Sequence, residues 1–287
     1  MKQRTITAVL ILTVLITTVL VDLNYNTPFL YILAILLALV ATKEMISMKE
    51  TVKQLPIEIH VFSYFAVLYL MFTNLSIEGE GRLFMIFSVL DLQFTLHSMA
   101  FLCLFVFLVM VFRERFSVND AGFILLSVMY VGITFHALIY IYNMGLNFLL
   151  YVVLVTTLTD TFAYFVGRLI GKHKLAPKIS PKKTIEGSVG GVIVSTTIAS
   201  IFAYSTIMPE IQFYYIIIIT FVISILAQIG DLVASSMKRR YNIKDFGTIF
   251  PGHGGVLDRL DSTLYASLAF FYVINILGYF NILIYNI

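Results

Sequence analysis

The chain has 287 residues, of which 60% are hydrophobic and only 12% are charged, and its formal net charge at pH 7 is +3. A mean hydropathy of +0.94 excludes an ordinary soluble domain, because repeated apolar runs of about 20 residues are typical of helices that span a bilayer. The single cysteine, Cys103, excludes an intramolecular disulfide framework and a metal site built on paired cysteines.

Nine apolar runs predict an all-α polytopic membrane protein with about nine transmembrane helices. In chain order the runs cover about 5–22, 28–43, 57–75, 92–112, 119–142, 147–170, 185–206, 211–235 and 258–280. We expect a single integral membrane domain over 1–287, since no flexible linker interrupts the runs. Polar residues are scattered in 1–146, which we interpret as scaffold spans, and cluster in 147–287, which we expect to carry the catalytic site.

The distribution of positive charge predicts the orientation of the spans. With a cytoplasmic N-terminus, 18 of the 19 Lys and Arg residues fall on the cytoplasmic side and Arg82 alone falls outside. This asymmetry follows the positive-inside rule. We therefore expect a multi-pass protein of the cytoplasmic membrane with its C-terminus outside. The segment from Lys43 to Lys53, which includes Glu44 and Glu50, is predicted to be a solvated cytoplasmic loop.

A first polar cluster runs from 159 to 191. One helical face gathers residues at three- and four-residue steps, namely Asp160, Tyr164, Gly167, Arg168 and Gly171. Gly167 with Gly171, and Gly187 with Gly191, are spaced as in the GxxxG motifs that let helix backbones approach closely in lipid. Packing alone is the alternative explanation for these glycines.

The loop inside this cluster is rich in lysine. It holds Lys172, Lys174, Lys178, Lys182 and Lys183. Ser180 and Pro181 predict a helix start, with Ser180 at the N-cap and Pro181 at the first helical position. Free amides and a partial positive charge at a helix start suit a phosphate group. The alternative is that the lysines only orient the neighbouring spans.

Three carboxylates in the last third of the chain predict a metal site. Asp258 and Asp261 share one face if they open a helix, and Asp231 lies near the end of an apolar run, where an unpaired carboxylate is costly. A salt bridge to Lys238 is the alternative for Asp231. Because the available ligands are oxygens, we expect Mg²⁺ rather than zinc, and the number of cations stays open.

A glycine-rich turn precedes the last apolar run. Gly254 and Gly255 can point successive backbone amides at an anion. His253 stands directly before them. It acts either as a ligand or acid, or as a residue that fixes the turn by hydrogen bonds.

The segment from Ser235 to Asp261 resembles the signature of the phosphatidate cytidylyltransferases, also called CDP-diglyceride synthases. Its fixed positions are filled by Ser235, Lys238, Arg239, Lys244, Asp245, Gly247, His253, Gly254, Gly255, Asp258, Arg259 and Asp261. The Ser-Pro-Lys-Lys-Thr and Glu-Gly run from Ser180 to Gly187 also matches this family. The resemblance implies a nucleotidyltransferase of phospholipid biosynthesis, in which phosphatidate attacks the α-phosphorus of CTP, CDP-diacylglycerol forms and pyrophosphate leaves.

The resemblance also implies roles for individual residues. Asp231, Asp258 and Asp261 would hold the cation. The other catalytic and substrate-binding candidates are Lys238, Arg239, His253, Lys244, Arg259, Gly254, Gly255 and Ser235, followed by Asp160, Lys182 and Lys183. The expected partners are CTP, phosphatidate and membrane lipid, with a homodimer implied by the family, and nucleic acid is not expected.

Two other functions stay open at this point. A CTP-dependent lipid kinase, such as a dolichol or phytol kinase, would transfer the γ-phosphoryl group of CTP to an alcohol. A polytopic transporter would place its binding groups near the bilayer midplane, whereas the charges here crowd one predicted side of the membrane.

Overall fold

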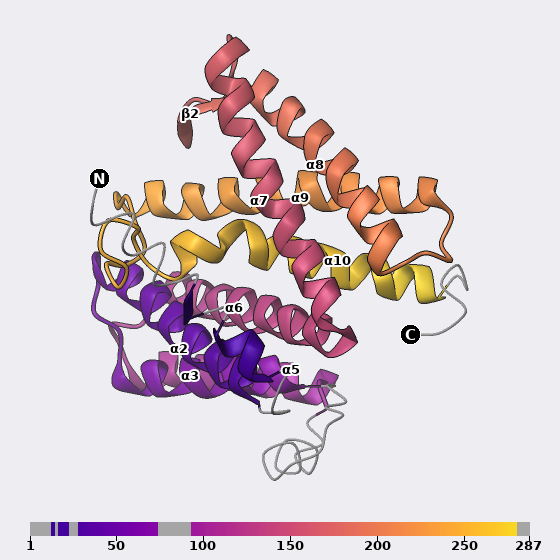
Figure 1. Ribbon diagram of the computed structural model, residues 1–287. Coiled ribbons are helices and arrows are strands. Elements are labelled where there is room, and N and C mark those ends of the chain that lie inside the picture. The colour runs from indigo at the N-terminus through magenta and orange to yellow at the C-terminus, as the bar shows by residue number, and fades with distance from the viewer. Residues whose placement is uncertain (1–12, 15–16, 23–27, 74–92, 280–287) are drawn as a thin grey trace. The chain divides into compact units, whose positions relative to one another are not determined.

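The structure is a computed structural model that describes residues 13–14, 17–22, 28–73 and 93–279. The helices and strands are α2 (Phe29–Glu50), α3 (Ile57–Phe72), α5 (Leu96–Phe112), α6 (Val118–Met144), α7 (Leu146–Ile170), β1 (Lys174–Ala176), β2 (Ser180–Thr184), α8 (Ile185–Thr206), α9 (Phe213–Arg240) and α10 (Leu257–Tyr279) (Figure 1). Helices dominate this part of the chain, and β1 and β2 form a short antiparallel pair. The predicted all-α class is confirmed.

The helices coincide with the predicted apolar runs. Six of them are long and apolar enough to cross a membrane, and α3 and α5 are shorter apolar helices of 16 and 17 residues. Eight of the nine runs therefore correspond to helices in the described residues. The ninth, 5–22, lies largely outside them. The total of nine spans and the orientation of the termini stay predictions.

The segment from Lys43 to Lys53 differs from its prediction. It is not a solvated loop, because α2 continues without a break to Glu50 and Glu44 is buried at 5% exposure. Lys49 and Lys53 both form ion pairs with Asp120 at the start of α6. These pairs compensate a carboxylate that is itself only 2% exposed, so the end of α2 belongs to the packed interior.

The chain folds as two compact units. Unit 1 comprises Met1–Ile139 and Tyr241–Arg259. In it, Phe62 of α3 stacks on Phe105 of α5 with ring centroids 4.6 Å apart. Gly132 of α6 lies directly against Leu70 of α3, where a Cβ atom would come within 2.7 Å of the leucine Cβ. Stacked rings and a small residue thus bring the scaffold helices of this unit together.

Unit 2 comprises Tyr140–Arg240 and Leu260–Ile287. Its apolar core is built from α7, α8, α9 and α10, with Tyr151 and Phe270 among its fully buried residues. Buried hydroxyl groups link the helices across this core. Tyr151 and Thr220 lie 2.7 Å apart, and Thr159 and Ser224 also lie 2.7 Å apart. Such bonds give polar groups the hydrogen-bond partners that lipid does not provide, and they stabilise helix contacts modestly.

α7 and α8 pack closely within unit 2, and the glycines of the two predicted GxxxG motifs lie at their crossing. A Cβ atom on Gly187 would lie 2.4 Å from the carbonyl oxygen of Ala163, and one on Gly191 would lie 2.5 Å from that of Thr159. Gly167 faces Gly187 at the same crossing. The glycines therefore allow backbone-to-backbone contact at the end of α7 that carries the polar cluster.

Candidate functional site

A pocket of about 400 Å³ lies in unit 2 between α7, the β1–β2 hairpin, α8 and α9. Its charged lining residues are Asp160, Arg168, Lys182, Lys183 and Asp231. Four of these five were predicted as site residues, and Arg168 was predicted only to share the helical face of Asp160. The pocket therefore brings together side chains from separate stretches of the sequence.

Lys183 and Asp231, which both line this pocket, form an ion pair. Their side chains are 24% and 23% exposed, so the pair is partly open to solvent. The hydroxyl of Ser235, one turn further along α9, donates to the other oxygen of Asp231 at 3.3 Å. The partner of Asp231 is thus a lysine 48 positions earlier in the chain, and the expected alternative, Lys238, does not form this pair.

Two further carboxylates lie close to Asp231. The hydroxyl of Ser262 donates to Asp160 at 3.1 Å, and the amide of Ser262 donates to Asp261 at 2.8 Å. Asp160, Asp231 and Asp261 are close enough for their charges to interact. Unit 2 therefore holds a group of acidic side chains from α7, α9 and α10, of which Asp261 is 9% exposed.

Two lysines offset part of the negative charge of these three carboxylates. Lys183 interacts electrostatically with Asp160 in addition to pairing with Asp231. Lys238, which is buried at 8% exposure, interacts with Asp261. Buried like charges repel one another unless cations compensate them, so the two lysines make the acidic group tolerable in the interior.

The lysine loop folds differently from its prediction. Ser180 does not cap a helix, because Ser180–Thr184 form strand β2, paired with β1 in the register Lys174 to Thr184 and Ala176 to Ser180. The helix starts at Ile185 instead, and the side chain of Thr184 caps it by accepting from the amide of Gly187 at 3.2 Å. Ser180 is paired with Ala176 in the strand, so the helix begins after the strand ends and Thr184, at its last position, provides the N-cap bond.

Glu186 in the first turn of α8 holds the beginning of the hairpin. Its carboxylate accepts from the amides of Lys172 and His173 at 3.0 and 3.2 Å and lies 2.6 Å from the His173 ring. The run from Ser180 to Gly187 that resembles the family therefore includes residues with a structural role. Thr184 and Glu186 shape the hairpin, and Lys182 and Lys183 are then presented to the pocket.

The glycine-rich turn of the signature lies in unit 1. Phe250 and Gly254 form an isolated antiparallel bridge, and the amide of His253 donates to the carbonyl of Phe250 at 2.8 Å. Gly252 and Gly254 have φ values of 77° and 85°, which residues with a side chain rarely adopt. His253 therefore does take part in the turn through its backbone. Its Nδ1 atom is buried and has no hydrogen-bond partner among the described residues.

Asp258 stabilises the same turn. Its Oδ2 atom accepts from the amides of Phe246 and Gly255 at 2.7 and 2.9 Å, and its side chain is buried. Because these bonds use one carboxylate oxygen, they fix the orientation of the other. They also occupy the amide of Gly255, one of the two that we predicted to face an anion.

Glu44 is the residue near this turn that the sequence analysis missed. Its two carboxylate oxygens accept from the amides of Val256 and Leu257 at 2.8 and 2.9 Å, in unit 1. These partners are more than 200 positions away in the sequence, and no local pattern around Glu44 indicates the contact. A carboxylate inside an apolar helix was the available signal, because such a group requires a partner.

The remaining predicted residues lie at or near the ends of α9 and α10. Arg239 donates from Nε to the carbonyl of Ile179 in the hairpin at 3.3 Å, within unit 2. Lys244 and Arg259 are exposed in unit 1. Phosphate binding by these side chains stays a prediction.

The donor atoms of the acidic group suit a hard cation. In residues 28–73 and 93–279, no group of three or more His, Cys, Asp or Glu side chains is arranged to hold a metal ion by itself. Magnesium, however, is commonly held by one or two carboxylates, with substrate phosphates and water completing its shell. Asp160, Asp231 and Asp261 offer oxygen donors of this kind, so the residues fit the predicted ion.

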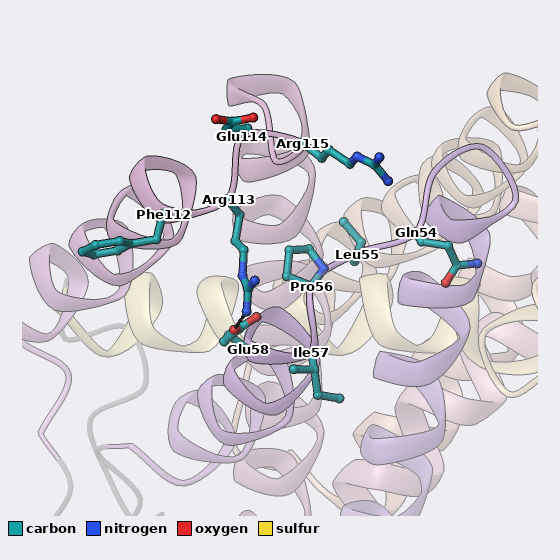
Figure 2. A pocket seen from close by; sticks show the side chains of 9 residues that line it. All are labelled: Gln54, Leu55, Pro56, Ile57, Glu58, Phe112, Arg113, Glu114 and Arg115. Atoms are coloured by element: carbon teal, nitrogen blue, oxygen red, sulfur yellow. Dashed lines mark hydrogen bonds and ion pairs between the residues drawn. The ribbon is translucent and has the colours of Figure 1, made fainter.

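A second pocket, of about 500 Å³, lies in unit 1 where α3 begins and α5 ends (Figure 2). Its lining includes Arg113, Glu114, Arg115 and Glu58. Arg113 points to Glu58 and forms an ion pair with it (Figure 2). This pocket contains none of the predicted site residues, whereas four of them line the pocket of unit 2.

Comparison with known proteins agrees with the signature. Residues 2–277 match the sequence model of the Cytidylyltransferase family. The chain is 38% identical over 265 residues to the phosphatidate cytidylyltransferase of Staphylococcus haemolyticus (strain JCSC1435), covering 92% of this chain and 95% of that protein. It is 40% identical over 266 residues to that of Staphylococcus saprophyticus, with the same coverage, and 45% identical over 156 residues to that of Bacillus subtilis (strain 168), covering 53% and 58%. The predicted resemblance is confirmed, and the chain belongs to the cytidylyltransferase family.

Proposed function

We propose that this protein is a phosphatidate cytidylyltransferase, which converts CTP and phosphatidate into CDP-diacylglycerol and pyrophosphate. The observation that carries the proposal is the pocket in unit 2, which gathers Arg168, Lys182 and Lys183 beside Asp160 and Asp231 in a chain of this family. Cations placed beside carboxylates suit a reaction between two phosphate groups. Relatives that carry the same activity in their names match over nearly their whole length.

The reaction joins two anions, so charge neutralisation is its main requirement. An oxygen of the phosphatidate phosphate forms a bond to the α-phosphorus of CTP, and the bond between that phosphorus and the β-phosphate oxygen breaks. A phosphate monoester has its second pKa near 6 and is largely a dianion at pH 7, so no general base is needed. Arg168, Lys182 and Lys183 would hold the phosphates in line and stabilise the charge that develops on the departing pyrophosphate.

The acidic group would hold the metal. We propose that Asp231 and Asp261 provide oxygen ligands to Mg²⁺, as the sequence predicted, with substrate phosphates and water completing its shell, and that Asp160 adds negative charge beside them in the same acidic group of unit 2. Bound Mg²⁺ would offset phosphate charge and polarise the phosphoryl oxygens. The ion pair with Lys183 would keep Asp231 oriented before substrate arrives. For Asp258, a role as a metal ligand is proposed from the resemblance to the family signature alone.

The location of the protein is also proposed. The six long apolar helices and the membrane-bound substrate support a multi-pass protein in the bilayer. The positive-inside distribution of Lys and Arg supports an active site on the cytoplasmic side of the cell membrane, where CTP is present. A homodimer is proposed from the family resemblance alone.

Position-specific labelling tests the activity. Purified protein in detergent would be given phosphatidate, Mg²⁺ and CTP labelled at either the α- or the γ-phosphorus, and the chloroform-soluble label would be counted. We expect transfer from the α position alone, dependent on phosphatidate and lost when a chelator is added. Transfer of the γ label to an alcohol lipid would instead identify a lipid kinase, and no transfer from either position would refute the proposal.

A further inference from the structure

Glu44 is a buried carboxylate with no part in the proposed chemistry. It lies in α2, a helix apolar enough to cross a membrane, and only 5% of it is exposed. A charge at such a position is costly unless its hydrogen bonds are satisfied. Both of its oxygens are satisfied by backbone amides, those of Val256 and Leu257. The contact therefore has a defined geometry and a defined target, the first turn of α10.

The loop of residues 246–257, which belongs to the family signature, has space for the side chain of Glu44. A Cβ atom on Gly247 would lie 2.6 Å from Oε1 of Glu44, and one on Gly255 would lie 2.2 Å from the same atom. Side-chain carbons do not come this close to a hydrogen-bonded oxygen without displacing it. Two glycines of the signature thus leave space that the Glu44 carboxylate fills.

Glu44 and Asp258 act on the loop together. Asp258 binds the amides of Phe246 and Gly255, and Glu44 binds the next two amides, those of Val256 and Leu257. The amides at a helix start have no partner within the helix and need one from outside. Negative charge at that end also interacts favourably with the helix dipole. The two carboxylates thereby fix where α10 begins.

We infer that Glu44 is a positioning residue for the proposed cytidylyl transfer. It fixes the loop of residues 246–257 and the first turn of α10, which carries Asp258 and Arg259. This inference rests on the proposed function, because those two residues matter only if the signature binds the substrates and the metal. Glu44 itself contacts backbone amides and is not assigned any contact with substrate.

Glu44→Gln is the first test, because glutamine has nearly the same volume. Its amide oxygen can accept one of the two hydrogen bonds, while its NH₂ group faces the other donor. We expect kcat/KM for CTP to fall about 10–100-fold, as for other residues that orient a site from behind. Both constants should change, since a displaced Arg259 weakens phosphate binding. A variant that only misfolds in part would lower kcat and leave KM unchanged.

Gly247→Ala provides a matched coupling test. In the wild-type background the new methyl group meets Glu44, and we expect at least about a 10-fold loss of kcat/KM. In a Glu44→Ala background that clash is absent, and we expect Gly247→Ala to cost less than about 2-fold. Residues in contact give non-additive effects of this kind, whereas independent sites give additive ones. Additive losses would overturn the inference.

Hydrogen–deuterium exchange separates this inference from the proposed function, since it requires no activity. Peptides covering 246–260 should exchange faster in Glu44→Gln than in the wild type, while peptides from α7 and α8 should be unchanged. Faster local exchange in a protein that transfers no cytidylyl group would refute the proposed function but not the placement of the loop by Glu44. Normal exchange and normal kinetics in Glu44→Gln, in an active wild type, would overturn the inference.

Discussion

Replacing Gly187 with alanine should force α7 and α8 apart. The added methyl carbon would lie 2.4 Å from the carbonyl oxygen of Ala163 and 2.9 Å from the Cα atom of Gly167. Carbon contacts are ordinarily about 3.5–4.0 Å, so the helices must separate by about 1 Å at this crossing. Both neighbours are backbone atoms that no rotamer change can move.

Overpacking of this kind lowers the free energy of unfolding by about 1–3 kcal/mol. The better helix propensity of alanine offsets less than about 1 kcal/mol of this loss. Gly167 and Thr184 line the pocket beside this crossing, so turnover by the folded protein should also fall. We therefore expect both a lower unfolding temperature and a lower activity. In chains of 150–250 residues, each kcal/mol corresponds to about 2–4 °C.

The matched control is Gly122→Ala. Gly122 lies in α6, and nothing comes within 4 Å of the position of its added Cβ atom. The assay would heat each purified variant in detergent and measure the fraction that stays monodisperse in size-exclusion chromatography. If Gly187→Ala survives heating as well as Gly122→Ala does, then the backbones of α7 and α8 are not in contact at Gly187.

Three further predictions concern single contacts. Lys183→Met removes the partner of Asp231, and we expect kcat/KM for CTP, measured by label transfer, to fall at least about 10-fold; an unchanged value would limit Lys183 to orienting the spans. Asp258→Asn should abolish turnover while the protein stays folded and inserted, and near-normal activity in that variant would contradict its place in the site. Tyr151→Phe removes the bond to Thr220 in the core and should lower the free energy of unfolding by about 0.5–1.5 kcal/mol with activity per folded molecule unchanged, so equal stability would show that this bond contributes nothing.

The helices were predictable from the sequence because lipid imposes a simple rule on them. A span needs about 20 apolar residues, and the runs at 147–170 and 185–206 agree with α7 and α8 to within a residue. Glycine spacing also predicted helix faces that allow a close backbone approach, since GxxxG depends on local helix geometry alone. Both signals lie within one or two turns of a helix and need no knowledge of distant contacts.

The partners of the buried charges were not predictable in this way. Asp231 was expected to have a partner, but its partner, Lys183, lies 48 positions earlier, in a strand that replaces the expected helix start. Glu44 was assigned to a solvated loop, because its short-range surroundings are charged and its amide partners lie more than 200 positions away. Tertiary contacts decide such cases, and one sequence does not contain them.

Cytidylyl transfer at the pocket of unit 2 can be tested directly by comparing one variant inside that pocket with one outside it. Transfer of α-label from CTP to phosphatidate would be measured for the wild type, for Asp231→Asn and for Glu114→Gln, an exposed carboxylate outside that pocket. We predict wild-type rates for Glu114→Gln and a loss of about 10²–10³-fold for Asp231→Asn, the magnitude expected when a preorganised electrostatic contact is removed. A folded Asp231→Asn protein that transfers label at the wild-type rate would show that the reaction takes place elsewhere.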